Sequence, residues 1–305
     1  MTDPAPPVVG LVGLGAMGEP VARRLLAAGY PVVGFDVDPA RVAALAAMGG
    51  TPASSVGAVA RSAATILTLL PSAAALADVA VQVAAAREGK GEGSTGTLVE
   101  LSTLGLADRQ AAQQVLAMAG VGMIDAALSG TAVQAARGDL VVYASGDAAS
   151  LAACGPVLEA IGRSVHRLGA FGSATITKLI ANHLVAVHIA AAAEALQLAR
   201  RSGLDPAVTL AALVDGAGTS RMLEVRGPMM VDQAYEPASM RVALFMKDIE
   251  LIESLAQAVG TATPQFDAAA GLFRATFDDG ERDRDTAVVH ETVGRYRRPS
   301  TGGRR

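Results

Sequence analysis

Three glycines near the N-terminus have the spacing of a dinucleotide-binding loop. Gly13, Gly15 and Gly18 stand between a short apolar run, "PVVGLVG", and a helical pattern, "GEPVARRLLAAG". In a strand–loop–helix of this kind, the first glycine makes a tight turn, the second lets the backbone approach a pyrophosphate, and the third lets the helix pack closely on the strand. The N-terminus of the helix supplies N–H groups that can bind the phosphates.

An acidic residue completes this pattern and bears on the choice of cofactor. Asp36 ends a second strand-like run, "YPVVGFD", and lies 18 residues after Gly18. A carboxylate in this place accepts hydrogen bonds from ribose hydroxyls, and its charge would repel a 2′-phosphate. Val37 follows it, and the nearest candidate phosphate-binding side chain is Arg41. The sequence therefore predicts that NAD is preferred, with NADP as the alternative.

A lysine and an asparagine form a second candidate group. Lys178 and Asn182 lie in a segment of helical apolar spacing that has no Pro or Gly from 173 until Gly203. Residues four apart share a helix face. On that face the lysine could act as a general acid or base, and the asparagine could orient it or bind a substrate hydroxyl. By spacing alone, a lysine on a solvated face is the simpler interpretation.

Other chemically capable residues have weaker patterns. His183 and His188 lie five apart, unlike the metal-binding pairs that are four apart on one helix face, so we predict no metal site. Arg221 could bind a substrate carboxylate or be a surface arginine. The single cysteine, Cys154, cannot form an internal disulfide and is expected to be a small core residue.

The elements that must position these residues alternate through the first half of the chain. Strands are expected at 63–71, 96–103, 122–130, 140–146 and 163–169, and helices at 107–120 and 147–162. This alternation predicts a mostly parallel, doubly wound sheet. The expected fold class is α/β, with an N-terminal Rossmann sheet followed by an all-α domain and joined to it by a long helix. The expected parts are an NAD-binding domain at 1–168, a helical substrate and dimerisation domain at 169–292, and a disordered basic tail at 293–305.

Composition narrows the classes of protein. Of the 305 residues, 51% are hydrophobic and 18% are charged, and the net charge is −4, which gives no sign of nucleic-acid or anionic-membrane binding. The start "MTDPAPP" lacks the pattern of a signal peptide, and the long apolar helix is interrupted by polar residues, so we expect no membrane span and a cytoplasmic location.

Four segments resemble motifs of the β-hydroxyacid dehydrogenase family, which includes 3-hydroxyisobutyrate dehydrogenases and tartronate semialdehyde reductases. Residues 9–30 resemble the cofactor motif, 125–140 the substrate-binding motif "DAALSGTAVQAARGDL", 169–183 the catalytic motif "GAFGSATITKLIANH", and 245–251 the Lys-Asp segment "FMKDIEL". The segments occur in the family's order and spacing over nearly the whole chain.

The resemblance implies an NAD(P)-dependent oxidoreductase that interconverts a small β-hydroxy acid and its semialdehyde or keto form. It implies that Lys178 is the general acid or base and that Asn182 helps to hold the substrate. The implied substrate-binding residues are Ser129, Gly130, Thr131 and Lys247. The implied cofactor-binding residues are Gly13, Leu14, Gly15, Ala16, Met17, Gly18, Asp36, Leu70, Pro71, Thr103, Lys247 and Asp248.

The family also implies pairing through the second domain, as a homodimer or homotetramer. Several residues depart from the family's pattern and leave the substrate open: Glu100, Ala127, Thr131, Gln134, Ala174 and Met240. Two alternatives are an imine reductase on a related scaffold and a non-catalytic nucleotide-binding protein of the same fold. Lys178 speaks against the first, because imine reductases usually lack that lysine, and the intact motifs speak against the second.

Overall fold

The computed structural model describes residues 5–88 and 96–296. The described residues divide into two compact units, the first ending at Lys178 and the second beginning at Leu179. The predicted domain boundary at residues 168 and 169 falls in the loop that precedes the helix containing this division.

The first unit contains an eight-stranded sheet within its described residues. Its order is β3-β2-β1-β4-β5-β6-β7-β8, and the neighbouring strands are parallel except for the antiparallel pair β6–β7. The strands are β1 (Val9–Val12), β2 (Val32–Phe35), β3 (Thr51–Pro52), β4 (Thr65–Thr68), β5 (Thr97–Glu100), β6 (Gly122–Ser129), β7 (Val141–Ser145) and β8 (Ser164–Arg167). The prediction of a mostly parallel sheet is confirmed, and each predicted strand is present.

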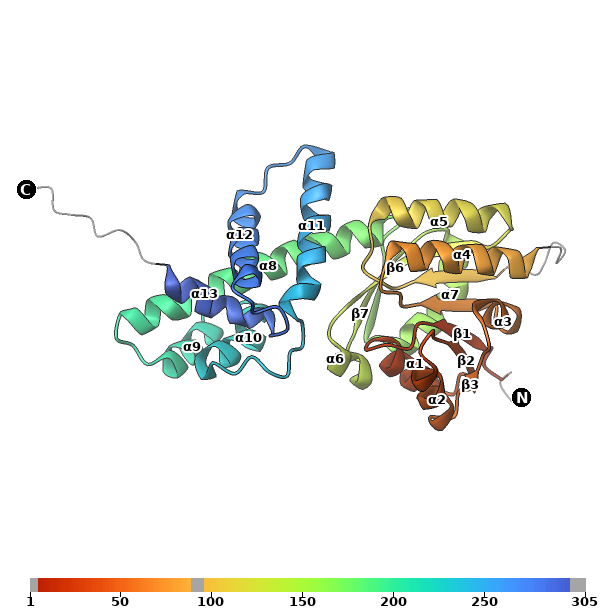
Figure 1. The fold of residues 1–305 in the computed structure, drawn as a ribbon, viewed down its shortest axis with the longest axis horizontal. Helices are drawn as coiled ribbons and strands as arrows, with labels where there is room; N and C mark the ends of the chain where they lie inside the picture. The colour runs from red at the N-terminus through yellow and green to blue at the C-terminus, as the bar shows by residue number, and fades with distance from the viewer. Residues whose placement is uncertain (1–4, 89–95, 297–305) are drawn as a thin grey trace, which may run out of the picture. The chain divides into compact units, whose positions relative to one another are not determined.

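Helices cover both faces of this sheet, as a doubly wound fold requires. They are α1 (Gly18–Ala27), α2 (Pro39–Ala47), α3 (Val56–Ser62), α4 (Ala73–Arg87), α5 (Leu106–Met118), α6 (Ala132–Arg137) and α7 (Ala148–Ile161). Helices α1, α2, α6 and α7 contribute to one hydrophobic core and α3, α4 and α5 to another. Figure 1 shows α4 and α5 side by side along the sheet.

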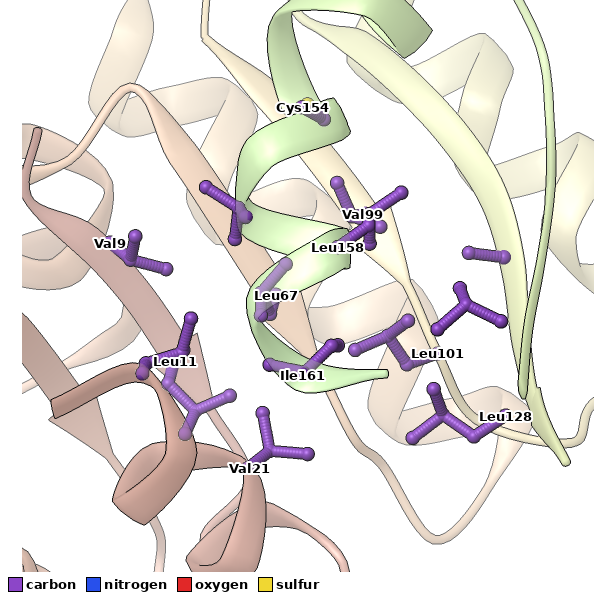
Figure 2. Close-up of a cluster of buried hydrophobic side chains, with 14 of the residues drawn as sticks. Val9, Leu11, Val21, Leu67, Val99, Leu101, Leu128, Cys154, Leu158 and Ile161 are labelled. Carbon is purple, nitrogen blue, oxygen red and sulfur yellow. The ribbon is translucent and has the colours of Figure 1, made fainter. Parts of the chain in front are cut away.

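The first of these cores explains the apolar runs of the sequence. Figure 2 shows Leu158 and Ile161 of α7 lying against Leu67 and Val99 of the central strands. Cys154 also lies in this core, as predicted, and burial raises the pKa of its thiol.

The antiparallel pair β6–β7 was not predicted. Parallel neighbours need a crossover of a dozen or more residues, whereas β6 and β7 are connected only by a turn and the six-residue helix α6. Helix α6 was also missed, because it is too short to show helical periodicity. This return places the end of β6 next to the start of β7, with Ser129 opposite Val141.

The second unit is helical throughout its regular elements. Helix α8 (Ser173–Arg201) begins in the first unit and continues into the second, as the predicted long helix. It is followed by α9 (Pro206–Asp215), α10 (Arg221–Asp232), α11 (Val242–Val259), α12 (Pro264–Asp278), the 3-10 helix η1 (Thr286–Val288) and α13 (Val289–Arg295). Helices α11 and α12 lie together (Figure 1), and the rings of Phe245 and Phe273 pack edge to face at 5.1 Å.

The composition of α8 bears on the expectation that the chain has no membrane span. By length and composition alone, α8 could cross a membrane, with a mean hydropathy of 1.6 in its most apolar window. Its Ile189, Ala193 and Leu196 lie in the hydrophobic core of the second unit, and a helix buried in a core has the same composition.

The predicted basic tail begins too early. Helix α13 continues to Arg295, and Val293 packs on the core of the second unit. Residues 297–305 of the predicted tail lie outside the described residues.

Candidate active site

The loop between β1 and α1 has no room for side chains at two of its glycines. Gly13 has φ +91°, and a Cβ there would lie 2.1 Å from the carbonyl oxygen of Leu69. A Cβ on Gly18 would lie 2.0 Å from the carbonyl oxygen of Gly13. The approach of Gly13 to Leu69 brings together the loops that follow β1 and β4. These loops lie at the point where the strand order reverses, which is the usual ligand crevice of such a sheet.

Asp36 is held against this loop by two backbone bonds. Its Oδ2 accepts the N–H of Leu14 at 2.7 Å, and its Oδ1 accepts the N–H of Asp38 at 2.9 Å. The side chain of Arg41 is half-exposed and lies 3.5 Å from both Asp36 and Asp38. The two carboxylates outnumber the guanidinium, so the charge beside the loop is negative overall.

The donors of this region fit a dinucleotide. Within the described residues, the N-cap residue of α1, Met17, makes no side-chain capping bond, and the N-terminus of this helix can bind phosphate oxygens. The loop after β4 is ordered by the N–H of Leu70, which donates to Ser102 Oγ at 2.7 Å. Pro71 follows Leu70, and Thr103 follows Ser102, so the implied cofactor residues of both loops adjoin this bond.

The end of β6 and the start of α6 form a second loop with hydrogen-bond donors. Gly130 has φ +141°, and Thr131 begins α6 in a capping box with Gln134. The N–H of Thr131 donates to Gln134 Oε1 at 3.0 Å, so that N–H already has a partner. Gln134, which stands where the family has glycine, therefore orders the loop that carries Ser129, Gly130 and Thr131.

The first turn of α8 is bonded to the sheet. The N–H of Ala174 donates to Ser145 Oγ at 3.0 Å, and the N–H of Thr175 donates to Asp125 Oδ2 at 3.0 Å. The hydroxyl of Thr175 donates to Asp125 Oδ1 at 2.6 Å. Lys178 lies three residues later on the same helix and is half-buried.

Asp125 is paired with a buried arginine from α5. Arg109 is 1% exposed, and its Nη1 lies 2.8 Å from Asp125 Oδ1. The same guanidinium donates to the carbonyl oxygens of Glu100, Ser102 and Ala126. The carboxylate of Glu100 accepts the hydroxyl of Thr68 and the N–H of Ser102. One guanidinium therefore ties the carboxyl end of β5 to the middle of β6.

The second unit contains the other implied site residues. Nδ2 of Asn182 donates to Asp248 Oδ2 at 2.8 Å, and Lys247 Nζ lies 3.8 Å from Asp248 Oδ1. Asn182 is buried, whereas Lys247 is half-exposed. The structure thus joins α8 to α11 within this unit and brings three of the predicted residues together.

The remaining candidates have ordinary structural partners. His183 stacks on Phe266 with ring centroids 5.1 Å apart. Arg221 is exposed and pairs with Glu224 one turn along α10. Among the residues that the structure describes, no three His, Cys, Asp or Glu side chains gather as a metal site would require.

Sequence reasoning missed the buried polar residues that bond the first turn of α8 to the sheet. Arg109, Ser145 and Thr175 were not singled out, and Asp125 was quoted within a motif without a role. A signal existed for Asp125, because a charged residue inside the apolar strand run "GMIDAAL" must have a buried partner. Its partners lie 16, 20 and 50 residues away, and no local pattern identifies them.

Two family models together match nearly the whole chain. Residues 8–169 match the family model of the NAD-binding domain of 6-phosphogluconate dehydrogenase, and residues 172–292 match that of the NAD-binding domain of NADP-dependent 3-hydroxyisobutyrate dehydrogenase. An L-threonate dehydrogenase of Cupriavidus necator is 34% identical over 92% of this chain and 94% of its own.

Two further relatives span nearly the whole length. An NAD-dependent L-serine dehydrogenase of Pseudomonas aeruginosa is 30% identical, over 93% of this chain and 96% of its own. The crystal structure of a 3-hydroxyisobutyrate dehydrogenase from Salmonella typhimurium superposes with a TM-score of 0.81 at 34% identity, over 93% of this chain and 99% of that one. The chain therefore belongs to the β-hydroxyacid dehydrogenase family of nicotinamide-dependent oxidoreductases.

Proposed function

We propose that this protein oxidises a small β-hydroxy acid to its semialdehyde or keto form, with NAD as the preferred cofactor and Lys178 as the general base. The observation that carries the proposal is the bonding of the first turn of α8 to β6 and β7. These bonds fix the position of the helix that carries Lys178 relative to β6, the strand that ends at Ser129. The glycine loop and Asp36 belong to the same unit.

A proton must move in this reaction, and the chain has a group to take it. When bound, the nicotinamide ring supplies a hydride acceptor for the carbon that bears the hydroxyl. The proton of that hydroxyl passes to the neutral Nζ of Lys178, and in the reverse direction the ammonium returns it to the carbonyl oxygen. Ser129 and Thr131 bind the substrate carboxylate through their hydroxyls and Gly130 through its backbone N–H, because the N–H of Thr131 is bonded to Gln134.

The preference for NAD is supported by charge. Asp36 and Asp38 surround the single guanidinium of Arg41, so a 2′-phosphate would enter a region of net negative charge. Val37, directly after Asp36, is 90% exposed and offers no donor. We expect a higher kcat/KM with NAD than with NADP, and the reverse order would contradict this assignment.

The substrate class follows from what the relatives share. L-Threonate, L-serine and 3-hydroxyisobutyrate all carry a hydroxyl on the carbon two bonds from the carboxylate carbon. The donors proposed for the carboxylate and the lysine proposed for the hydroxyl match these two groups. The test is a panel of these three acids, each assayed for reduction of NAD and of NADP by the purified protein.

The central variant is Lys178→Ala, assayed on the best substrate of that panel. We expect kcat to fall about 10²–10⁴-fold, the usual contribution of a positioned acid or base. The affinity for NAD should stay the same, and Lys178→Arg should not restore the rate, because guanidinium does not release its proton near neutral pH. Turnover of a cyclic imine but of no hydroxy acid would favour the imine reductase alternative, and absence of any turnover the non-catalytic one.

We also propose that the protein is a homodimer or homotetramer in the cytoplasm. Ile180 and Leu184, which lie one turn apart on α8, are 54% and 48% exposed in the single chain, and Leu244 on α11 is 58% exposed. Exposed apolar side chains one turn apart on a helix, such as Ile180 and Leu184, are typical of an interface. A single cysteine fits a reducing compartment. Light scattering that gives a monomer of 30.7 kDa would contradict the assembly.

A further inference from the structure

Side chains of the sheet cap two of the first N–H groups of α8, while the N–H of Ser173 donates to the carbonyl oxygen of Ala170 in the preceding loop. The first N–H groups of a helix have no partners within the helix and are usually satisfied by a Ser, Thr, Asp or Asn directly before it. In α8, Ser145 of β7 and Asp125 of β6 accept the N–H groups of Ala174 and Thr175. The first turn is therefore bonded to two strands.

Asp125 can occupy only one orientation. Its Oδ1 accepts bonds from Arg109 and from the hydroxyl of Thr175, and its Oδ2 accepts bonds from the hydroxyl of Ser145 and the N–H of Thr175. Asp125 and Ser145 are fully buried, and Thr175 is nearly so. A buried carboxylate is tolerated only when it is paired and hydrogen-bonded, so any rotation would leave charge or donors unsatisfied.

We propose that Asp125, held by Arg109, is a positioning residue that sets the place of Lys178 through its bonds to Thr175. Lys178 lies less than one helical turn after Thr175, so a displacement of the first turn of α8 also displaces Nζ of Lys178. Asp125 also lies on the strand that ends at Ser129, so the substrate loop and the lysine share this anchor. The inference rests on the proposed role of Lys178.

The variant that tests this is Thr175→Val, which is close in shape and removes only the hydroxyl bond to Asp125. We expect kcat to fall about tenfold, within the range of a catalytic group misplaced by a fraction of an ångström. The affinity for NAD should not change. Thr175→Ser keeps the hydroxyl and should retain kcat within about threefold of the wild type. If the valine variant does not fold, Thr175→Ala takes its place.

The matched control is Thr286→Val in the second unit. Thr286 is also fully buried, and its hydroxyl lies between an arginine and an aspartate, 2.8 Å from Arg226 Nε and 3.3 Å from Asp285 Oδ1. The substitution should lower the melting temperature as Thr175→Val does, but it should leave kcat unchanged. Equal losses of kcat in the two variants would mean that Thr175 has only a general structural role.

The decisive measurement places Thr175→Val on the Lys178→Ala background. If Thr175 acts through Lys178, the second substitution lowers kcat no further, because groups that act as a unit are not additive. A Lys178→Ala enzyme with kcat within about threefold of the wild type would overturn the proposed function. A large effect of Lys178→Ala, together with either no effect of Thr175→Val or the same factor on both backgrounds, would overturn only the positioning role.

Discussion

Each unit of the molecule contains a buried arginine–aspartate pair, and the two aspartates bond to different kinds of segment. In the first unit, Arg109 and Asp125 are 1% and 0% exposed and lie 2.8 Å apart. In the second, Arg226 and Asp285 are 4% and 0% exposed and lie 3.1 Å apart. Both pairs satisfy the rule that buried charges must be matched, so the pairing itself does not distinguish them.

The remaining bonds of the aspartate make the difference. Asp125 accepts the N–H and hydroxyl of Thr175 and so caps the helix that carries Lys178. Asp285 accepts the N–H groups of Ser239, Met240 and Ala287, all in irregular or 3-10 segments.

In helix α11, which carries Lys247 and Asp248, the first N–H groups are not bonded to Asp285. The N–H groups of Val242 and Ala243 donate to the carbonyl oxygens of Arg284 and Arg282. Main-chain atoms therefore anchor α11, whereas the side chains of Asp125 and Ser145 anchor α8. If Asp125 positions Lys178 as proposed, a buried ion pair acquires a functional role through the further group that its carboxylate binds, here the first turn of α8.

The largest effect on stability is expected when Arg226 is replaced by Met. Asp285 would then be buried without its cation, and breaking a buried pair in this way costs about 3–5 kcal/mol of the free energy of unfolding. Because Asp285 does not cap α11, kcat of the folded fraction should stay at the wild-type value. Urea unfolding and kcat at low temperature would measure both. A stable variant with tenfold lower kcat would show that the Arg226–Asp285 pair also affects the reaction.

A smaller effect is expected from Ser145→Ala, which removes the acceptor for the N–H of Ala174 and a donor to Asp125. Loss of such a bond costs about 1 kcal/mol of the free energy of unfolding. Because the first turn of α8 loses one of its two caps, we also expect kcat to fall severalfold. Ser239→Ala, which removes a hydroxyl bond to Asp285, is the matched variant and should leave kcat unchanged. Parallel melting curves and kcat values for the two variants provide the test.

The smallest effect concerns the pH dependence of the second pair. Burial by itself would raise the pKa of Asp285, but the charge of Arg226 and the bonds from Ala287, Ser239 and Met240 outweigh it and hold the pKa below its usual value. As the pH falls, Asp285 is therefore protonated at a higher pH in the unfolded chain than in the folded one. The stabilising contribution is present above the ordinary pKa of aspartate, about 3.9, and is lost as the pH falls through the lower folded value.

Asp285→Asn should therefore flatten the pH dependence of the free energy of unfolding in the acid range. Urea unfolding at a series of pH values between neutral and acid would measure it. Asp283→Asn, which changes a side chain that is 85% exposed, is the control and should retain the wild-type dependence. Identical curves for Asp285→Asn and the wild type would show that this carboxylate contributes nothing to acid stability.

Much of the fold and part of the site could be predicted because the signals are local. The glycines at 13, 15 and 18, the acid at 36, and the apolar strands each occupy a short segment whose geometry follows from residue type. The capping box of Thr131 and Gln134 was also local, but Gln134 was interpreted only as a departure from a family glycine. The pairing of β6 with β7 was missed because the direction of a strand depends on the length of a connection, which residue patterns show poorly.

Four features follow from residue types and spacing alone: the dinucleotide loop, its acid, the alternation of strands and helices, and the shared face of Lys178 and Asn182. These features depend on backbone freedom, charge and periodicity within about one or two elements. The bonds of Asp125 to Arg109 and Thr175 became evident only from the folded chain. The same holds for the bond between Asn182 and Asp248, which are 66 residues apart. A buried polar group needs a partner, but which residue supplies it depends on how the chain returns in space, and no spacing in the sequence records that.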